Sequence, residues 1–249
     1  MSLNHQEFLR YSRQMMVDDM GEEAQEKLKN STAVIVGLGG LGCPTSLYLA
    51  AAGFGKLILI DGDEIELSNL QRQILFRESD IGIPKAKVAA KRLSKLNPHI
   101  QLDVVIERVD RQGLVSLVDE ANIVLDCTDN MATRQEINRA AVAFKKPLIS
   151  AAAMGWEGQI LEIRADIEGS ACLACAYGLE SEEPLLNCST AGVIGPVLGV
   201  MGSLQAMRAI QITAGTSSSK GTSLSRFDGK RGSWSSFELA AKADCPVCS

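Results

Sequence analysis

The length, composition and charge of the chain exclude several classes of protein. Its 249 residues suffice for one large core, or for one core with a modest appended lobe. The net charge of −5 and the 4% aromatic content disfavour a nucleic-acid partner, which would need a basic or a base-stacking surface. No apolar stretch is long enough for a membrane helix, and residues 1–13 are too polar for a signal peptide, so we expect a cytoplasmic protein with no membrane partner.

The first part of the chain has the pattern of a nucleotide-binding turn. Apolar and charged residues alternate irregularly from Asn4 to Asn30, which predicts one or two amphipathic helices. The apolar run Ala33 to Val36 predicts a strand that passes into a glycine turn, Gly37-Leu-Gly39-Gly40-Leu-Gly42, and a helix ending near Gly53. Glycines allow a tight turn and let backbone N–H groups approach a phosphate, so this order indicates a Rossmann-like nucleotide site.

A second predicted strand, Leu57 to Ile60, ends on an acidic residue. Asp61 follows the last glycine of the turn by about 20 residues, the spacing at which an acidic side chain suits a ribose hydroxyl. The turn and this aspartate leave NAD, FAD and ATP open.

The following segments alternate between helix and strand. Pro84 begins a helix that Asn97-Pro98 ends. The remaining pattern predicts a doubly wound α/β fold with a mostly parallel sheet, with strands at Leu102–Val109, Ile123–Leu125 and Leu148–Ala153 and helices at Leu114–Val118 and Thr133–Phe144.

The pattern changes from Gly155 onward. We expect a loop at Gly169–Pro184, a packed helix at Thr190–Ala214, and antiparallel strands that extend the sheet at Gln159–Ile163, Leu224–Phe227 and Trp234–Leu239. We interpret residues 1–249 as a single domain, with a nucleotide-binding half at 1–154 and a second half at 155–249.

Four of the seven cysteines form two C-x-x-C pairs. Cys172 with Cys175 and Cys245 with Cys248 offer the two knuckles of a tetrahedral zinc site, and the separation between them matters little once the fold joins them. Redox-active pairs or free thiols are the alternative. They are disfavoured because neither pair is predicted to open a helix after a strand, as a redox motif would. The sequence therefore predicts a structural zinc site.

Charged residues after the strands distinguish between nucleotides. Asp61 and Asp129 both follow predicted strand ends, so they should face one crevice, where Asp129 can hold Mg²⁺. Arg72 and Lys85 would bring two positive charges to the phosphates. Two cations and a metal-type carboxylate favour a triphosphate undergoing chemistry over NAD.

The ordered motifs resemble a known family. GLGGLG at Gly37–Gly42, SNLQRQ at Ser68–Gln73, IGIPKA at Ile81–Ala86, DCTDN at Asp126–Asn130 and the two C-x-x-C pairs are similar to those of the ThiF/MoeB/HesA family, the bacterial relatives of ubiquitin-activating enzymes. The segments NLQRQILF and LDCTDNMATRQEIN are closer to the thiazole-pathway branch than to the molybdopterin branch.

This resemblance implies an activity and its partners. Family members adenylate the C-terminal glycine of a small β-grasp sulfur-carrier protein that ends in Gly-Gly, and they release pyrophosphate. It further implies a homodimer, bound ATP, Mg²⁺ and Zn²⁺, and a sulfurtransferase or cysteine desulfurase as a further partner.

The resemblance also implies roles for individual residues. Asp61 would hold the ribose and Asp129 the Mg²⁺, and Arg13 matches an arginine that family members contribute from the neighbouring subunit. The ATP-binding residues would be Gly39, Gly40, Gly42, Asp61, Asn69, Arg72, Gln73 and Lys85, with Arg13, Arg72, Lys85 and Asp129 serving catalysis.

The remaining cysteines divide into two groups. Cys188 lies in LLNCSTAG and matches a family cysteine implicated in covalent linkage to the carrier and in sulfur transfer, although an unreactive loop cysteine is an equal alternative. Cys43 and Cys127 are interpreted as small residues packed beside the nucleotide site.

Three alternatives to a thiazole-pathway adenylyltransferase remain at this point. The first is the same reaction on the molybdopterin-synthase carrier. The second is an NAD-dependent oxidoreductase, and the third is a non-catalytic, zinc-stabilised binding module. The presence of only two histidines does not disfavour adenylation, because a glycine carboxylate is ionised at neutral pH and needs no general base.

Overall fold

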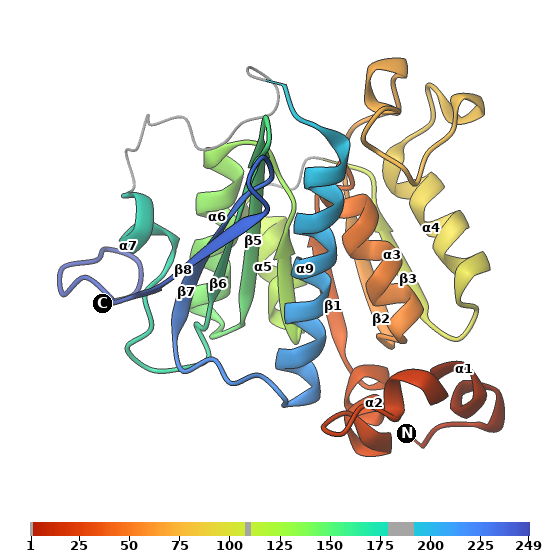
Figure 1. Cartoon of the computed structure of the whole chain (residues 1–249), viewed down its shortest axis with the longest axis horizontal. Helices are drawn as coiled ribbons and strands as arrows, with labels where there is room; N and C mark the ends of the chain where they lie inside the picture. Colours follow the sequence, from red (N-terminus) through yellow and green to blue (C-terminus); the bar gives the residue numbers. More distant parts are fainter. Residues whose placement is uncertain (1, 108–110, 179–191) are drawn as a thin grey trace.

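One mixed sheet forms the centre of the molecule (Figure 1). The computed structural model describes residues 2–107, 111–178 and 192–249. Within them, eight strands lie in the order β3-β2-β1-β4-β5-β6-β7-β8, parallel from β3 to β5 and antiparallel from β5 to β8. The strands are β1 (Thr32–Val36), β2 (Lys56–Ile60), β3 (Gln101–Val105), β4 (Ile123–Asp126), β5 (Leu148–Met154), β6 (Glu157–Ile163), β7 (Thr222–Asp228) and β8 (Ser233–Leu239).

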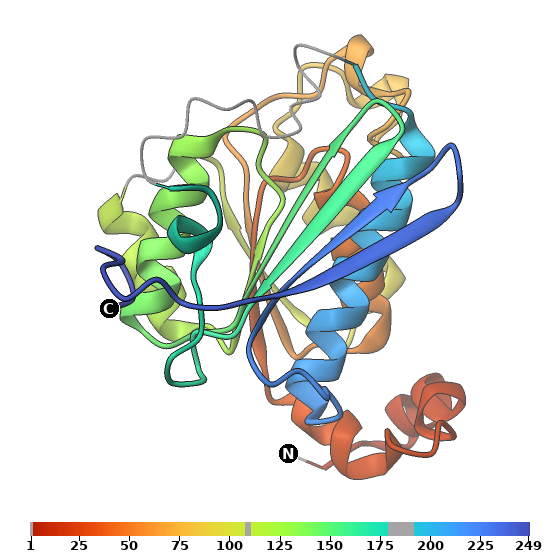
Figure 2. The same ribbon diagram turned by 60° about the vertical axis from the view of Figure 1, so that its left-hand side comes forward.

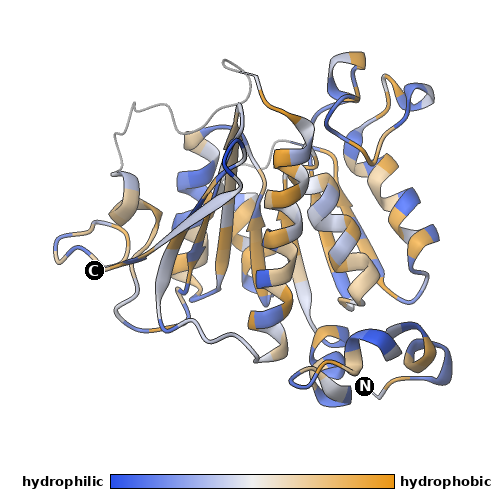
Figure 3. Ribbon diagram, in the orientation of Figure 1, coloured by the Kyte–Doolittle hydropathy of each residue, from blue (hydrophilic) through white to orange (hydrophobic). Residues whose placement is uncertain are grey.

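Helices cover both faces of the parallel strands (Figure 2). Alternate strand residues enter two cores, so that Ile35 and Leu59 pack with α3, α4 and α9, whereas Val34 and Ile58 pack with α5, α6 and α7. Hydrophobic residues accordingly concentrate along the central strands (Figure 3). The helices are α1 (His5–Met15), α2 (Gly21–Lys29), α3 (Gly42–Ala52), α4 (Lys85–Leu96), α5 (Arg111–Glu120), α6 (Met131–Ala143), α7 (Leu173–Tyr177) and α9 (Gly195–Ala214), with 3₁₀ turns at Leu67–Asn69 and Glu78–Asp80.

Local sequence explains several helix ends. Asn4 and Glu7 form a capping box at the start of α1, and the Asn130 side chain caps α6 by accepting a hydrogen bond from the Thr133 N–H. Gly53 ends α3 in the left-handed conformation, with φ of 86°. The start of α1, the end of α3 and both ends of α6 lie within two residues of the predicted positions.

The predicted fold class is confirmed, and several predicted segments have different bounds, three of them for a visible reason. The strand predicted at Leu102–Val109 ends at Val105, because β2, its neighbour, ends at the paired Ile60. The helix predicted from Thr190 begins only at Gly195, because the preceding Ile194 N–H donates to the Gly155 carbonyl. The predicted loop at 169–184 contains the short helix α7, and residues 179–184 lie outside the described residues.

The described helices include none with the length and apolar character that crossing a membrane requires.

Candidate active site

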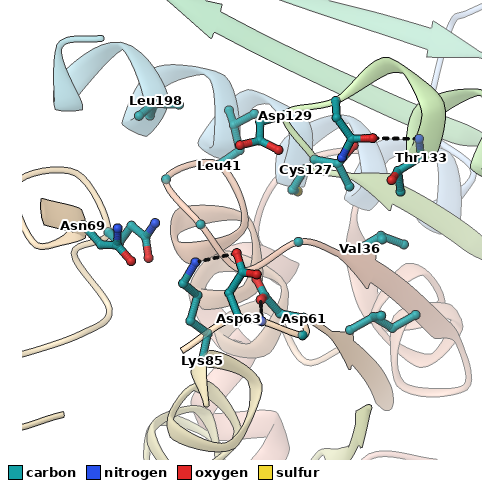
Figure 4. Close-up of a pocket in the computed structure, with 18 of the residues that line it drawn as sticks. Val36, Leu41, Asp61, Asp63, Asn69, Lys85, Cys127, Asp129, Thr133 and Leu198 are labelled. Atoms are coloured by element: carbon teal, nitrogen blue, oxygen red, sulfur yellow. Dashed lines mark hydrogen bonds and ion pairs between the residues drawn. The ribbon is translucent and has the colours of Figure 1, made fainter. Parts of the chain in front are cut away.

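A cavity of about 630 Å³ opens at the carboxyl ends of β1, β2 and β4 (Figure 4). This is the edge of a parallel sheet at which nucleotides bind in doubly wound folds. Eight residues predicted to bind ATP or Mg²⁺ line it: Gly39, Gly40, Asp61, Asn69, Arg72, Gln73, Lys85 and Asp129.

Two glycines of the turn, Gly37 and Gly42, are required for different steric reasons. Gly37 has φ of 89°, and a Cβ there would lie 2.8 Å from the Cys127 carbonyl oxygen. Gly42 does not line the cavity, although the sequence predicts that it binds the nucleotide. A Cβ on Gly42 would lie 2.0 Å from the Gly37 carbonyl oxygen, so Gly42 allows the strand and the helix to approach each other.

Asp61 joins the end of β2 to the glycine turn. Its Oδ2 accepts a hydrogen bond of 2.7 Å from the Leu38 N–H, and its Oδ1 accepts one of 2.8 Å from the Asp63 N–H. Burial raises the pKa of the Asp61 carboxyl group, while the nearby Lys85 ammonium opposes that rise. Each carboxylate oxygen keeps lone-pair capacity for a further donor, such as a ribose hydroxyl.

Positive charge enters the cavity on the same side. Lys85, at the start of α4, is buried, and its Nζ lies 3.2 Å from Asp63 Oδ2 (Figure 4). Arg72 extends from the segment between β2 and α4, and its Nη1 donates a 2.9 Å hydrogen bond to the Ser68 carbonyl oxygen. An ammonium and a guanidinium at one edge of a cavity suit an anionic ligand.

Asp129 lies across the cavity from Asp61 and Lys85 (Figure 4). It follows β4 and is exposed, and its carboxylate has no hydrogen-bond or ion-pair partner among the described residues. A free carboxylate facing a cavity that also holds cations can bind a hydrated divalent metal ion together with phosphate oxygens.

The four predicted metal-ligating sulfurs come together at the other end of the chain. Sγ of Cys172 lies 3.7 Å from that of Cys245, Sγ of Cys175 lies 3.5 Å from that of Cys248, and all four sulfurs lie within 4.8 Å of one another. Zn–S bonds of about 2.3 Å in a tetrahedron place sulfurs about 3.8 Å apart, so the cluster can hold zinc. Cys172 occupies the N-cap position of the short helix α7, but residues 164–171 separate this helix from β6, so the pair does not open a helix directly after a strand. The meeting of the two pairs also favours a metal site.

Comparisons with known proteins agree with this geometry. Residues 11–247 match the model of the ThiF family. The chain belongs to the ThiF family.

Its relatives include two curated proteins of Escherichia coli (strain K12). The chain is 50% identical over 246 residues to the sulfur carrier protein ThiS adenylyltransferase, covering 99% of this chain and 97% of that protein. It is 42% identical over 246 residues to the molybdopterin-synthase adenylyltransferase, covering 99% and 98%. A crystal structure of E. coli MccB with ATP superposes with a TM-score of 0.84 at 27% identity, covering 99% of this chain and 75% of that one.

The predicted family is therefore confirmed, and the predicted enzyme class agrees with the names of both relatives. Neither name supports the NAD-dependent oxidoreductase or the non-catalytic module that the sequence left open.

Arg13, which the family resemblance singles out, does not line the cavity. Arg13 lies exposed on α1, which packs near the amino-terminal end of β1 and so lies opposite the cavity (Figure 1). An Arg13 that serves catalysis must therefore reach a different molecule. Cys188 lies outside the described residues.

The two other cysteines of this ThiF-family chain are packed as predicted. Cys43 and Cys127 are buried, and burial raises the pKa of the Cys43 thiol to about 12 and also raises that of Cys127. Neither thiol is suited to nucleophilic chemistry at neutral pH.

The sequence did not single out two further residues of the cavity. Asp63 pairs with Lys85, and its only sequence signal is its position two residues after Asp61. Arg134 on α6 lines the cavity and is 4% exposed. A lone arginine in a predicted helix carries no such signal, because most arginines are solvated.

Proposed function

We propose that this protein is an ATP-dependent adenylyltransferase that activates the C-terminal glycine of a ubiquitin-like sulfur-carrier protein for synthesis of the thiamine thiazole. One observation carries the proposal: all the residues expected to bind ATP except Gly42 line a single cavity, in a chain that is 50% identical to a ThiS adenylyltransferase. The 42% identity to the molybdopterin-synthase enzyme makes that carrier the second candidate.

The proposed reaction joins two anions. A carboxylate oxygen of the carrier's terminal glycine attacks the α-phosphorus of ATP, a new P–O bond forms, and the bond from the α-phosphorus to the bridging oxygen of pyrophosphate breaks. The products are an acyl-adenylate and pyrophosphate. No proton is transferred, so the chain must supply alignment and positive charge rather than a general base.

The cavity offers groups for each part of ATP. Asp61 would accept hydrogen bonds from the ribose, and the turn with Gly39 and Gly40 would let its backbone face the phosphates. Lys85 and Arg72 would stabilise negative charge on the phosphates, with Asn69 and Gln73 lining the same side. When ATP binds, the Lys85 ammonium would contact a phosphate oxygen as well as the Asp63 carboxylate.

Two metals belong to this proposal. Asp129 would hold Mg²⁺, which would neutralise phosphate charge, and the exposed carboxylate across from Lys85 supports this role. Zinc on Cys172, Cys175, Cys245 and Cys248 would be structural, because all four positions are thiols and none is left for a substrate.

The proposed function also includes a homodimer. Arg13 would enter the active site of the partner subunit, and its exposure on α1 is compatible with this role. Mixing an inactive Arg13→Ala variant with an inactive Asp129→Ala variant tests it, since dimers that exchange subunits should regain one intact site and part of the activity. No recovery after verified subunit exchange would contradict the shared site.

The proposal also includes a chemical role for Cys188. A covalent link to the carrier, with sulfur supplied through a sulfurtransferase or cysteine desulfurase, predicts that Cys188→Ser stops thiocarboxylate formation while adenylation continues. Thiocarboxylate formation at the full rate in that variant would exclude the link.

An ATP–pyrophosphate exchange assay tests the function and the carrier together. We expect exchange with a thiazole-pathway carrier and at least tenfold slower exchange with a molybdopterin-pathway carrier. A carrier that lacks its terminal glycine is the control and should support none. The reverse preference would assign the protein to the molybdopterin pathway.

A further inference from the structure

A buried arginine donates hydrogen bonds to the backbone of the loop that carries Asp129. Arg134 lies one turn into α6, and its side chain is 5% exposed. Its Nη2 donates hydrogen bonds to the carbonyl oxygen of Thr128 and, at 2.8 Å, to that of Ala151 in β5. The Thr128 carbonyl belongs to the peptide bond that precedes Asp129, so the guanidinium ties this peptide to the sheet.

A buried carboxylate completes the anchor. Asp126, the last residue of β4, is 1% exposed and lies 3.6 Å from Arg134 Nη1. Its Oδ1 accepts hydrogen bonds of 3.0 Å from the Thr128 N–H and 2.6 Å from the Thr128 hydroxyl. Ser150 links the two charges, since its hydroxyl donates to Asp126 Oδ2 at 2.5 Å and accepts from Arg134 Nη1 at 3.1 Å.

Thr128 is thus held at its N–H, its hydroxyl and its carbonyl oxygen by two buried charges. The residue that follows Asp129 is also held, because the Asn130 side chain caps α6. Asp129 itself lies between these anchors, and its carboxylate has no partner of its own among the residues described. The position of that carboxylate therefore depends on the backbone, and the backbone depends on Arg134.

We propose that Arg134 is a positioning residue that sets the geometry of Asp129 toward Mg²⁺-bound nucleotide without itself contacting the metal. The inference rests on the proposed function, in which Asp129 binds the metal. Its chemical basis is the guanidinium fork: a planar group with five donors can reach Asp126, Ser150 and two carbonyl oxygens at once. A lysine ammonium keeps the charge that Asp126 needs but cannot span these acceptors.

The test measures ATP affinity by calorimetry with and without Mg²⁺, in the full-length protein and without a carrier. The dissociation constant of ATP without Mg²⁺, divided by the dissociation constant with Mg²⁺, measures the coupling between metal and nucleotide binding. We expect Arg134→Lys to reduce this ratio about tenfold, the size typical of losing a group that orients a metal ligand, while the affinity for metal-free ATP stays within about twofold. Ser150→Ala should reduce the ratio in the same direction by about threefold.

Arg139→Lys is the matched control, because Arg139 lies on the same helix and, among the described residues, pairs with Glu136 near the surface. Its ratio should equal that of the wild type. Melting temperature and bound zinc report whether each variant folds.

Three results would overturn the inference. An Arg134→Lys variant with lower melting temperature and an unchanged ratio would have a structural role only. An equal loss of affinity with and without Mg²⁺ would mean that Arg134 contacts the nucleotide directly. A wild-type protein whose ATP affinity does not respond to Mg²⁺ would refute the metal role of Asp129 itself, and would be recognised before any variant is compared.

Discussion

The parallel region, β1 to β5, and the antiparallel region, β6 to β8, differ in how well their strands are covered by other elements. In the parallel region helices cover both faces, and the strand ends that carry Asp61 and Asp126 are buried with their backbones fixed. In the antiparallel region every residue from Ser233 to Glu238 is exposed, and β8 is the free edge of the sheet (Figure 2). The cavity forms where helices cover both faces of the sheet, whereas the segment after β8 meets α7 at the cluster of four cysteines.

The largest expected effect lies in the cavity. Asp129→Ala should reduce ATP–pyrophosphate exchange about 10³-fold, equivalent to about 4 kcal/mol, because it removes the carboxylate proposed to hold Mg²⁺. Zinc content should not change, since the thiol cluster is separate from the cavity. Asp119→Ala, which removes an exposed carboxylate from α5, is the control and should exchange normally. Normal exchange by Asp129→Ala would refute the metal role.

Much of the cavity was predictable because its residues follow local patterns. Gly37 to Gly42 and Asp61 lie where apolar runs end, and a strand end in a parallel sheet has a known place in the fold. The two C-x-x-C pairs likewise carried their own signal.

The pairings inside the cavity were not predictable. Lys85 meets Asp63, and Arg134 meets Asp126, only after α4 and α6 fold back onto the sheet. No local spacing encodes these contacts. Strand ends were missed for a similar reason: β3 ends at Val105 because its neighbour ends, which is a tertiary cause.

A pair of alanine substitutions compares the rigidity of the two regions. A Cβ at Gly42 would lie 2.0 Å from the Gly37 carbonyl oxygen, which the backbone cannot move away, so Gly42→Ala should cost about 3–5 kcal/mol of unfolding free energy. A Cβ at Gly158 in β6 would lie 2.4 Å from Met201 Sδ, and a methionine can choose another rotamer. Gly158→Ala should therefore cost about 1–3 kcal/mol. Urea unfolding measures both, and equal costs would contradict the contrast.

Loss of the thiol cluster should lower the stability of the protein without changing the cavity. Cys245→Ser leaves three sulfurs and should abolish stoichiometric zinc binding. A stability loss of about 2 kcal/mol would lower the melting temperature by about 4–8 °C in a chain of this size. ATP affinity should stay within about twofold, because the cavity lies in the parallel region. A tenfold loss of ATP affinity would show that the two regions are coupled.

The smallest expected effect is the pH dependence of ATP binding. Burial raises the pKa of Asp61 in the folded protein above its ordinary value of 3.8, so the carboxylate proposed to bind the ribose is protonated on acidification sooner than an exposed aspartate would be. Asp61→Asn should weaken ATP binding about tenfold at neutral pH and remove this acid dependence, as titration at several pH values would show.

Acidification should weaken ATP binding through Asp61, but through the same group it should increase the stability of the nucleotide-free protein. A raised folded-state pKa contributes stability that is fully present below the unfolded pKa and is lost as pH rises through the folded value. Asp61→Asn should remove this pH dependence of stability, but it should also cost about 1 kcal/mol, because an amide has one oxygen and leaves the N–H of Leu38 or of Asp63 without its acceptor. A variant that binds ATP like the wild type would contradict the role of Asp61.

The central claim is that the cavity at the carboxyl ends of β1, β2 and β4 transfers AMP to the terminal glycine of a sulfur carrier. Intact-mass analysis of a thiazole-pathway carrier after incubation with the enzyme, ATP and Mg²⁺ tests it most directly. We predict a carrier heavier by one adenylyl group, formed with release of pyrophosphate, and none with the Asp129→Ala variant. An unmodified thiazole-pathway carrier and an unmodified molybdopterin-pathway carrier, in the presence of enzyme that binds ATP, would contradict the claim.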